Sequence, residues 1–239
     1  MKKNNHQLDD QLIEMLIERG NSGNRYVGIK LFLWQFTINM AYFIKRSADI
    51  GVAMLMILML SPLLICVAVL IKLESKGPVV FTQVRVGKNG RYFNFFKFRS
   101  MRVGAERQKA ELQQQNESAD GVIFKMKHDP RITRVGRIIR KFSIDELPQL
   151  FNVLVGDMSL VGPRPPLPSE VANYTLEEYK RLHITPGITC IWQVSGRSDI
   201  PFKQQVELDK EYIKSRSLWK DLLILLKTIP AVITGRGAY

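Results

Sequence analysis

Two apolar stretches stand out in the first third of the chain. The longer one, Ile50 to Ile71, holds 22 residues without a charged side chain. As a straight helix it would be about 33 Å long, which is enough to cross the hydrocarbon core of a bilayer. Length alone therefore predicts a transmembrane helix.

Two features of the same stretch favour a re-entrant helix instead. Ser61-Pro62 lies at its centre, and proline removes a helical hydrogen bond and bends the helix. Basic residues lie on both flanks: Lys45, Arg46, Lys72 and Lys76. A spanning helix carries positive charge mostly on its cytoplasmic side, whereas a helix that bends and returns to the same face keeps both flanks there. Protein or the Ser61 hydroxyl must then cover the backbone groups freed at the bend.

The shorter apolar stretch, residues 27–44, contains Lys30, Gln35 and Asn39. The pattern predicts either an interfacial helix or a helix buried against the main domain. Within residues 1–25, apolar residues recur at helical spacing, which predicts a short amphipathic helix followed by a loop at 20–24.

The polar remainder of the chain begins with a strand pattern. Two runs rich in β-branched and aromatic residues flank Lys88-Asn89-Gly90, so residues 79–101 are predicted to form a small β-hairpin. Residues 102–120 are charged and Gln-rich, which indicates an exposed helix or loop. Residues 169–183 and 202–216 have helical composition.

A last amphipathic helix is predicted at residues 217–229. Its apolar face is formed by Leu218, Leu222, Leu225, Leu226 and Ile229. Pro230 is expected to end it. This helix belongs either in the core or at a membrane interface, and Trp219 beside Lys220 and Lys227 favours the interface.

These elements predict an α+β fold, mostly helical, in three parts. Residues 1–45 form an amphipathic extension, residues 46–72 a membrane helix bent at Ser61-Pro62, and residues 73–239 the main domain. The chain carries 35 Lys+Arg against 22 Asp+Glu, a formal net charge of +13. Such a surplus favours anionic partners: nucleic acid, anionic lipid headgroups or phosphorylated substrates.

Cysteine and histidine usage argues against a disulfide framework or a zinc site. Cys66 and Cys190 are far apart in the sequence, and His6, His128 and His183 show no ligand-like spacing. The candidate chemistry lies elsewhere, in residues 129–168.

Arginine recurs every three residues at the start of that segment. Arg131, Arg134, Arg137 and Arg140 would form a basic ridge on a helix. Guanidinium groups pair bidentately with phosphate oxygens, so the ridge suits a diphosphate. The alternative is a stripe that faces solvent or lipid headgroups.

Two adjacent carboxylates follow the ridge. Ser143 and Glu146 fit a capping box, and Pro148 fits a helix that starts near Asp145, so both acids have a structural explanation. The functional alternative is that one carboxylate attacks a phosphoryl group while its neighbour holds Mg²⁺ together with substrate phosphates. A rigid Pro-rich turn then presents Arg164.

Several long motifs resemble those of the monotopic phosphoglycosyl transferases, also called bacterial sugar transferases. The matching stretches are KRSADIGVAMLMILMLSPLLICVAVLIKLESKGPVVFTQVRVGKNG, FNFFKFRSM, DPRITRVGRIIRKFSIDELPQLFNVLVGDMSLVGPRP, PGITCIWQVSGRSDIPF and the terminal GRGAY. They cover about residues 45–239. Cys190 departs from the glycine or alanine expected after PGIT. Some relatives carry four transmembrane helices and a soluble domain upstream, so this chain resembles a short member.

The resemblance implies roles for individual residues. Asp145 is implied as the nucleophile that forms a covalent phosphosugar intermediate, and Glu146 as its Mg²⁺-linked partner. Residues implied to bind substrate are Lys97, Arg99, Arg137, Arg140, Arg164, Gln193 and Arg197. The resemblance also implies the bend at Ser61-Pro62.

The resemblance further implies the reaction and its place. A hexose-1-phosphate would pass from a UDP-sugar to undecaprenyl phosphate, a polyprenyl phosphate, with release of UMP. This would be the first membrane step of exopolysaccharide, capsule or O-antigen-type synthesis. The enzyme would sit among the lipids of the bacterial inner membrane, with its catalytic domain on the cytoplasmic face, without nucleic acid, and would supply downstream glycosyltransferases.

Two other classes remain to be compared. A basic, membrane-tethered adaptor for anionic lipid or nucleic acid would need only the charge and the apolar stretch, and not the Asp145-Glu146 pair. A multi-spanning transferase would need many hydrophobic spans, and the sequence offers one firm candidate. The sequence thus favours the monotopic enzyme.

Overall fold

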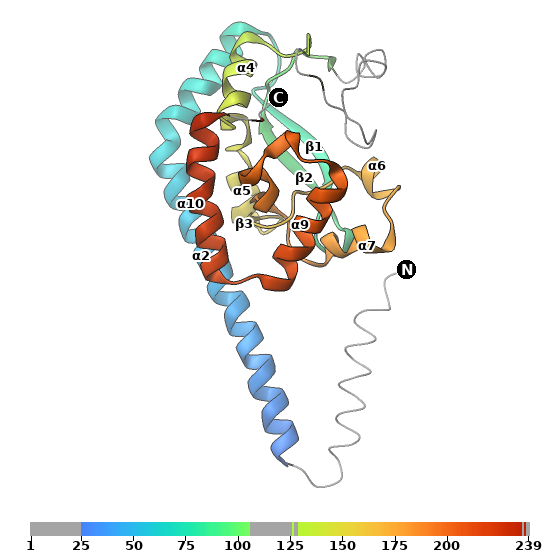
Figure 1. The fold of residues 1–239 in the computed structure, drawn as a ribbon. Coiled ribbons are helices and arrows are strands. Elements are labelled where there is room, and N and C mark those ends of the chain that lie inside the picture. The colour runs from blue at the N-terminus through green and yellow to red at the C-terminus, as the bar shows by residue number, and fades with distance from the viewer. Residues whose placement is uncertain (1–24, 106–125, 127–128, 236, 238–239) are drawn as a thin grey trace. The chain divides into compact units, whose positions relative to one another are not determined.

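The computed structural model describes residues 25–105, 126, 129–235 and 237 (Figure 1). The chain divides into two compact units between Ala48 and Asp49, inside one long helix, α2 (Arg25–Glu74). The three-part division expected from the sequence stays a prediction. The amphipathic helix predicted within residues 1–25 and most of the 102–120 segment lie outside the described residues.

Residues 27–44 belong to α2 and do not form a separate helix. Their large apolar side chains are exposed; Phe32 is 69% exposed and Phe43 is 66% exposed. The expectation of an interfacial helix or of a helix buried against the main domain stays a prediction. The exposure agrees with an apolar helix that needs a lipid environment.

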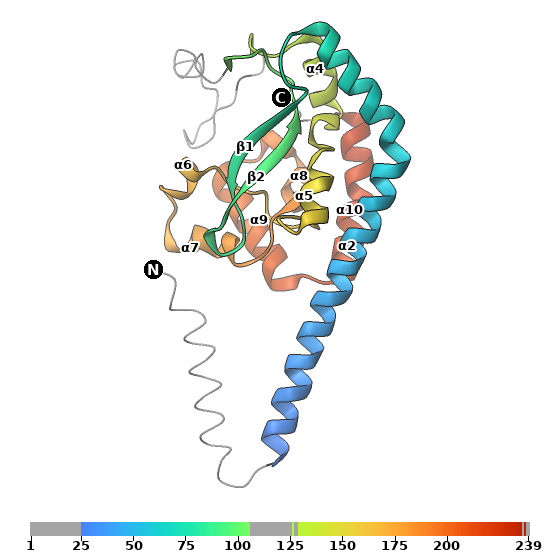
Figure 2. The same cartoon turned by 180° about the vertical axis from the view of Figure 1, so that it is seen from behind.

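Helix α2 contains the proline at which the sequence predicts a bend. Pro62 lies inside α2, and the helix changes direction in its cyan stretch, between residues 50 and 75 (Figures 1 and 2). In a regular helix an amide at position 62 would donate to the Leu58 carbonyl. The Ser61 hydroxyl donates to that carbonyl at 2.8 Å instead. The backbone acceptor freed by proline thus has a partner inside the helix.

The predicted hairpin is confirmed. Strands β1 (Val80–Val86) and β2 (Tyr92–Phe98) pair antiparallel, with Val80 opposite Phe98. A single turn, η1 (Lys88–Gly90), joins them, and Asn89 and Gly90 both take positive φ angles of 56° and 77°. These are the residue types that adopt that conformation most readily.

Helix α5 (Gln149–Val155) covers the free edge of β2. Its fully buried Asn152 accepts from the Phe96 amide at 3.1 Å and donates to the Asn94 carbonyl at 2.7 Å. One side-chain amide therefore acts as a short piece of neighbouring strand.

A second, parallel sheet was not expected from the sequence. It consists of β3 (Ser159–Val161) and β4 (Gly187–Thr189). The strands approach so closely that a Cβ on Gly187 would overlap the Gly162 amide nitrogen. Three-residue strands leave too little periodicity for a sequence pattern to reveal.

The remaining chain is helical. The stretch 169–183 forms three short pieces, α6 (Pro168–Val171), α7 (Leu176–Tyr179) and η4 (Lys180–His183). The predicted 202–216 helix is α9 (Phe202–Ser215). Between β4 and α9 lie α8 (Ile191–Ser195) and η5 (Arg197–Asp199).

The last helix, α10 (Leu218–Thr234), runs through Pro230, so the predicted end at that residue is wrong. It ends at Gly235, which has a left-handed φ of 61°. A glycine in this conformation closes a helix more decisively than a proline near its last turn.

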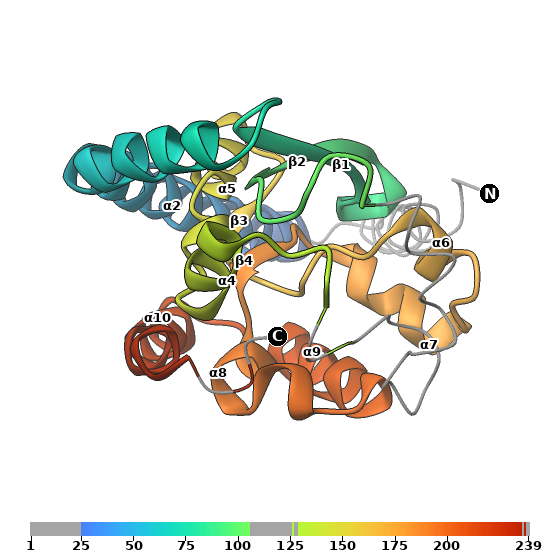
Figure 3. The ribbon, with the colours of Figure 1, turned by 90° about the horizontal axis from the view of Figure 1, so that it is seen from above.

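Two of the four apolar clusters described in the second unit connect α2 to the rest of it. The larger combines residues of β2, α5, β3, α9 and α10 with Ala53 of α2, and the smaller packs Val67 and Ile71 of α2 against Phe98 and Ile139. Seen from above, the last part of α2, helix α4 (Arg134–Lys141) and α10 lie along one side, and α6 and α7 lie on the other (Figure 3). The last part of α2 is thus packed into the fold that carries residues 129–168.

Candidate active site

Helix α4 leads into the predicted carboxylate pair. Its first turn is capped by the Thr133 hydroxyl, which accepts from the Gly136 amide at 2.9 Å, and by the Glu74 carboxylate, which accepts from the Arg134 amide at 2.7 Å. After α4, Ser143 takes a left-handed φ of 53° and starts a single turn, η3 (Ile144–Glu146). The end of α2 and the strained Ser143 thereby fix where the pair lies.

The capping-box interpretation of Ser143 and Glu146 is wrong. The Ser143 side chain makes no capping hydrogen bond, and the next helix, α5, begins only at Gln149. The Glu146 carboxylate turns to two cations instead. Lys97 Nζ donates to its Oε1 at 2.7 Å, and Arg164 Nη1 donates to the same oxygen at 3.0 Å.

Asp145 and Glu146 differ in their proton affinity. Burial raises the pKa of both carboxyls, but Lys97 and Arg164 outweigh it at Glu146 and hold that pKa well below its usual range. Asp145 is 7% exposed and lies 3.8 Å from Lys97 Nζ. Its pKa is raised by burial and by Glu146, although Lys97, Arg140 and Arg164 oppose the shift. The site therefore holds one firmly ionised carboxylate beside a more basic one.

Arg85 is a site residue that the sequence reasoning missed. Its guanidinium donates to Gln83 Oε1 at 2.8 Å and to the Pro165 carbonyl at 3.0 Å, next to Arg164. It also lies 5.2 Å from the Phe95 ring centroid, and Lys97 Nζ lies 5.5 Å from the same centroid. Alternation along β1 and β2 could have found it, because the hairpin register puts Arg85 and Lys97 on one face.

Arg197, which comes later in the sequence, interacts electrostatically with Asp145 and Glu146. Burial lowers its pKa, and Glu146 and Asp145 act in the opposite direction. Its backbone has a φ of 53°, and its Nη1 atom is buried with no hydrogen-bond partner among the described residues. Gln193, four residues earlier, accepts from Cys190 Sγ at 3.1 Å.

The other basic residues predicted from the sequence differ in their burial and contacts. Arg140 is half-buried and its charge lowers the pKa of Asp145, whereas Arg137 is exposed on α4. Arg99 is buried and donates to the Ser75 carbonyl at 2.7 Å and the Lys76 carbonyl at 3.2 Å, just after the end of α2, and its expected substrate contact stays a prediction. Arg131 forms an ion pair with Asp129 at 2.6 Å, so the first arginine of the predicted ridge has a partner within the fold.

The two carboxylates suit a metal site that substrate phosphates complete, and they do not form a full set of metal ligands by themselves. The described residues contain no cluster of three or more His, Cys, Asp or Glu side chains placed to hold a metal ion. Asp145 and Glu146 supply two carboxylates, and one oxygen of Glu146 already binds two cations. Mg²⁺ is commonly held by one or two carboxylates plus substrate phosphates, so this donor set fits Mg²⁺ once phosphates arrive.

Comparison with known proteins identifies the family. A family model described as "Bacterial sugar transferase" matches residues 40–235, most of the chain. The chain belongs to the bacterial sugar transferase family. The resemblance seen in its motifs is thereby confirmed, and family membership favours a transferase over a binding adaptor.

Relatives within this family differ in length. The chain is 49% identical over 200 residues to "Galactosyl transferase CpsE" of Streptococcus agalactiae, covering 81% of this chain and 43% of that protein. It is 44% identical over 200 residues to "Undecaprenyl-phosphate galactose phosphotransferase" of Salmonella typhimurium, covering 82% and 42%. The chain thus spans under half the length of these two.

A third relative in the bacterial sugar transferase family is similar in size. "Exopolysaccharide production protein ExoY" of Sinorhizobium fredii is 41% identical over 198 residues, which cover 82% of this chain and 88% of that protein. The matched segment therefore also occurs in a relative with little additional sequence.

Proposed function

We propose that the protein is a membrane-associated phosphoglycosyl transferase that moves a hexose-1-phosphate from a UDP-sugar to undecaprenyl phosphate. The observation that carries the proposal is the buried Asp145, with a raised pKa, beside a Glu146 that Lys97 and Arg164 hold ionised. The names of the relatives, which include galactose phosphotransferases acting on undecaprenyl phosphate, support this reaction class.

In the first half-reaction, an Asp145 carboxylate oxygen attacks the β-phosphorus of the UDP-sugar. A bond forms between that oxygen and phosphorus, and the bond from phosphorus to the bridging oxygen breaks, so that UMP leaves with the electron pair. A carboxylate with a raised pKa is a stronger nucleophile than an ordinary aspartate once ionised. The product on the enzyme is an acyl phosphate that carries the sugar.

In the second half-reaction, an oxygen of the polyprenyl phosphate attacks the same phosphorus. The bond from phosphorus to Asp145 breaks, and the carboxylate is regenerated. Both substrates are anionic, so two separate displacements keep their charges from meeting in one step. Downstream glycosyltransferases would then extend the lipid-linked sugar in polysaccharide synthesis.

The cations around the pair offset the charge of the phosphates. Lys97, Arg164 and Arg140 surround the carboxylates. The buried Nη1 atom of Arg197 has no hydrogen-bond partner among the described residues and can donate to a phosphate. When bound by Glu146 and Asp145, Mg²⁺ would add Lewis-acid neutralisation of the diphosphate. Preorganised positive charge of this kind stabilises the transition state without reorganisation.

The proposed location is the cytoplasmic face of the inner membrane. Helix α2 is the one described helix long and apolar enough to cross a membrane. We propose that it enters the bilayer, bends at Ser61-Pro62 and returns to the same face. The carboxylate pair would then lie near the headgroup level, where the polyprenyl phosphate is presented.

Replacing the nucleophile tests the mechanism. Asp145→Asn keeps the side-chain volume but removes the attacking oxygen anion, so we expect loss of essentially all UMP release from a UDP-hexose with undecaprenyl phosphate. The wild type should show ping-pong kinetics, and trapping without acceptor should add one hexose phosphate to the peptide that contains Asp145.

Asp157→Asn is the matched control, because Asp157 is exposed on the loop after α5. It should keep wild-type turnover. Near-normal turnover of Asp145→Asn, or kinetics that require a ternary complex, would contradict the covalent mechanism. An adaptor would tolerate both substitutions equally.

Metal removal tests the role given to Glu146. We expect EDTA to abolish UMP release and added Mg²⁺ to restore it, because two phosphate-bearing substrates meet at a site with only two carboxylates. UMP formation is measured with the chelator, then with excess Mg²⁺. Full activity in the chelator would exclude the metal from the reaction.

A further inference from the structure

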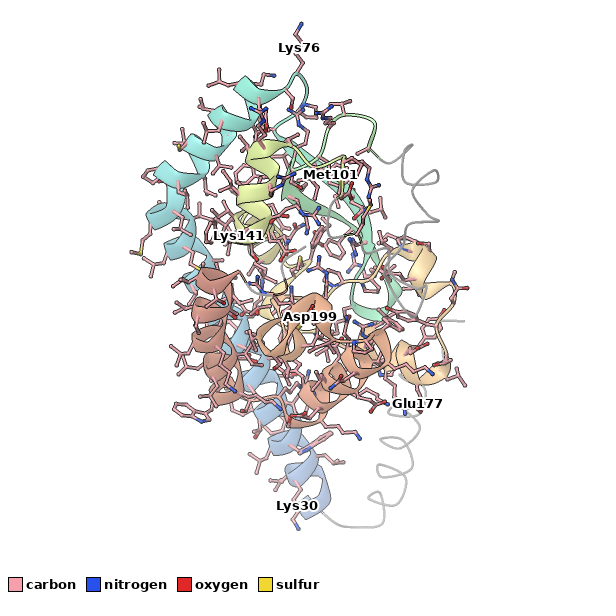
Figure 4. The ribbon with its side chains drawn as sticks, turned by 45° about the horizontal axis from the view of Figure 1, so that its top comes forward. Lys30, Lys76, Met101, Lys141, Glu177 and Asp199 are labelled. Atoms are coloured by element: carbon pink, nitrogen blue, oxygen red, sulfur yellow. The ribbon has the colours of Figure 1, made fainter. Side chains whose placement is uncertain are left out.

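Gly235 and Gly237, near the end of the chain, approach two segments that flank the carboxylate pair. A Cβ on Gly235 would lie 2.9 Å from Lys141 Cγ and 3.0 Å from the Lys141 carbonyl oxygen. A Cβ on Gly237 would lie 2.7 Å from the Gly196 carbonyl oxygen and 3.2 Å from Arg197 Cβ. Residues 235 and 237 therefore pass from the end of α4 to the turn that begins η5. Lys141 and Asp199, labelled in Figure 4, mark these two segments.

Both segments position groups of the site. Lys141 ends α4 and is followed, two residues on, by the left-handed Ser143 that turns the chain toward Asp145. Arg197 opens η5, and its charge interacts with Asp145 and Glu146. A displacement of either segment would change how the arginine faces the carboxylates.

The Arg197 turn needs external support. Arg197 is one of three non-glycine residues described with positive φ, and such a backbone persists only where its surroundings hold it. On one side Gly196 packs against Ile200, where a Cβ would lie 3.0 Å from Ile200 Cγ1. On the other side Gly237 contacts the turn, and any larger residue there would press on the Gly196 carbonyl oxygen.

The charged end of Arg197 is available to a ligand. Its Nη1 atom is buried, and within the described part of the chain no hydrogen-bond acceptor reaches it. Buried donors are normally paired, so this unpaired donor, on a side chain whose charge interacts with Asp145 and Glu146, indicates a missing anionic acceptor. A phosphate oxygen of the nucleotide donor has the chemistry to fill that place.

We propose that the C-terminal glycines brace the Arg197 turn, so that Gly237 positions Arg197 to bind the diphosphate of the donor. The proposal rests on the proposed function and assigns a task to the two glycines of the terminal GRGAY motif. Gly237 is a positioning residue, because it acts through Arg197 and touches no reacting atom.

Two glycine substitutions separate the brace from backbone strain. Gly237 and Gly90 have similar positive φ angles, 66° and 77°, but a Cβ on Gly90 would meet nothing within 4 Å. Both Gly237→Ala and Gly90→Ala therefore strain the backbone, and only Gly237→Ala collides with the Arg197 turn. We expect Gly237→Ala to lower kcat/KM for the UDP-sugar by about tenfold or more, because small displacements at a site are costly. Gly90→Ala should stay near wild type.

Ping-pong kinetics make the readout specific. The value of kcat/KM for the donor reports the first half-reaction, and that for the polyprenyl phosphate reports the second. Gly237→Ala should lower the donor value selectively, with an unfolding midpoint close to that of Gly90→Ala. An equal fall in kcat/KM for both substrates would overturn the proposed brace. Equal donor kcat/KM values for the two glycine variants would also overturn it.

A double-mutant cycle tests whether Gly237 acts through Arg197. Arg197→Gln and Gly237→Ala should each lower the donor kcat/KM. The double variant should have a donor kcat/KM close to that of the less active single variant. Losses that multiply would show that Gly237 acts elsewhere and would overturn the proposal even if Gly237→Ala folds poorly. If the wild type releases no UMP from any UDP-hexose, the proposed function fails instead.

Discussion

Asp145 and Glu146 are neighbours in the chain with different environments. Glu146 accepts hydrogen bonds from Lys97 and Arg164, whereas Asp145 lies 3.8 Å from Lys97 and is more deeply buried. Interacting carboxyls share their protons, and the cations decide which one ionises first. In the proposed mechanism, the more basic carboxylate, Asp145, would attack phosphorus, and Glu146 would organise the cations.

Lys97 should set the acid limb of the pH profile. The raised pKa of Asp145 would rise further without Lys97, which is the largest influence lowering it. Activity requires ionised Asp145, so it falls as the pH drops through that pKa. We expect the acid limb of kcat/KM in Lys97→Met to lie at higher pH than in the wild type, measured as UMP release across pH.

Lys203→Met is the control, because Lys203 is exposed on α9. Its acid limb should coincide with that of the wild type. An unchanged or lowered acid limb in Lys97→Met would show that Asp145 is not the group that titrates.

At the scale of elements, the end of α2 is tied to the site by side chains that a membrane anchor alone would not need. Arg99, directly after β2, donates to the Ile71 carbonyl of α2 at 3.4 Å and to the Ser75 carbonyl just after α2 at 2.7 Å, and Glu74 caps α4. Helix ends leave backbone groups unpaired, and these contacts supply partners for both. The bent helix therefore positions the helix that leads to Asp145.

The bend should decide the topology of α2. With Pro62, the N-terminus and the domain of residues 73–239 are expected on the same, cytoplasmic side. A cysteine introduced at position 5 should therefore resist an impermeant thiol reagent in intact cells, in a background without Cys66 and Cys190. Pro62→Ala restores an amide donor, so it should straighten the helix and expose position 5 to the reagent.

Ser61→Ala provides the comparison. It removes the 2.8 Å bond to the Leu58 carbonyl but keeps the proline, so position 5 should stay protected. Labelling of the otherwise unmodified protein from outside would contradict the re-entrant arrangement.

At the scale of the whole molecule, buried polar pairs join segments that are distant in sequence. The Arg181 guanidinium pairs with Asp209 at 2.7 Å, with side chains only 4% and 1% exposed. It also bonds the Tyr174 hydroxyl at 3.0 Å and lies over the rings of Tyr174 and Phe202. This cluster fastens η4 to α9 behind the site.

Breaking this pair should destabilise the fold. Asp209→Asn would leave Arg181 as a buried charge without its counter-ion, and such losses cost about 3–5 kcal/mol. We expect a correspondingly lower free energy of unfolding in detergent. Glu177→Gln, which breaks an exposed pair with Lys180, should have far less effect. Equal stability of the two variants would mean that the buried pair contributes little.

The sequence predicted what rests on local patterns. Alternation and Asn89-Gly90 fixed the hairpin, and Pro62 marked the bend in α2. The motif at residues 129–168 pointed to Asp145 and Glu146, although their capping explanation proved wrong once Lys97 and Arg164 were seen on Glu146.

What the sequence could not provide depends on contacts between distant residues. Arg99 and Arg131 resemble Arg164 in sequence, but their partners in the fold, the Ser75 carbonyl after α2 and Asp129, could not be read from it. Likewise, Pro230 is a strong helix-ending signal locally, yet α10 continues to Gly235. Propensity gives way where packing fixes the backbone.

The contact between Asp49 and β3 has a consequence for biosynthesis. Ser159 Oγ donates to the Asp49 carboxylate at 2.7 Å across 110 residues of sequence, and the Leu160 amide donates to it at 3.3 Å. Ribosomes add about 5–20 residues per second, so roughly 5–20 s separate the synthesis of these partners. For most of that interval α2 is complete but β3 does not exist. The apolar helix is therefore made before the strand that Asp49 contacts, and a nascent chain stalled short of residue 159 would isolate that early state.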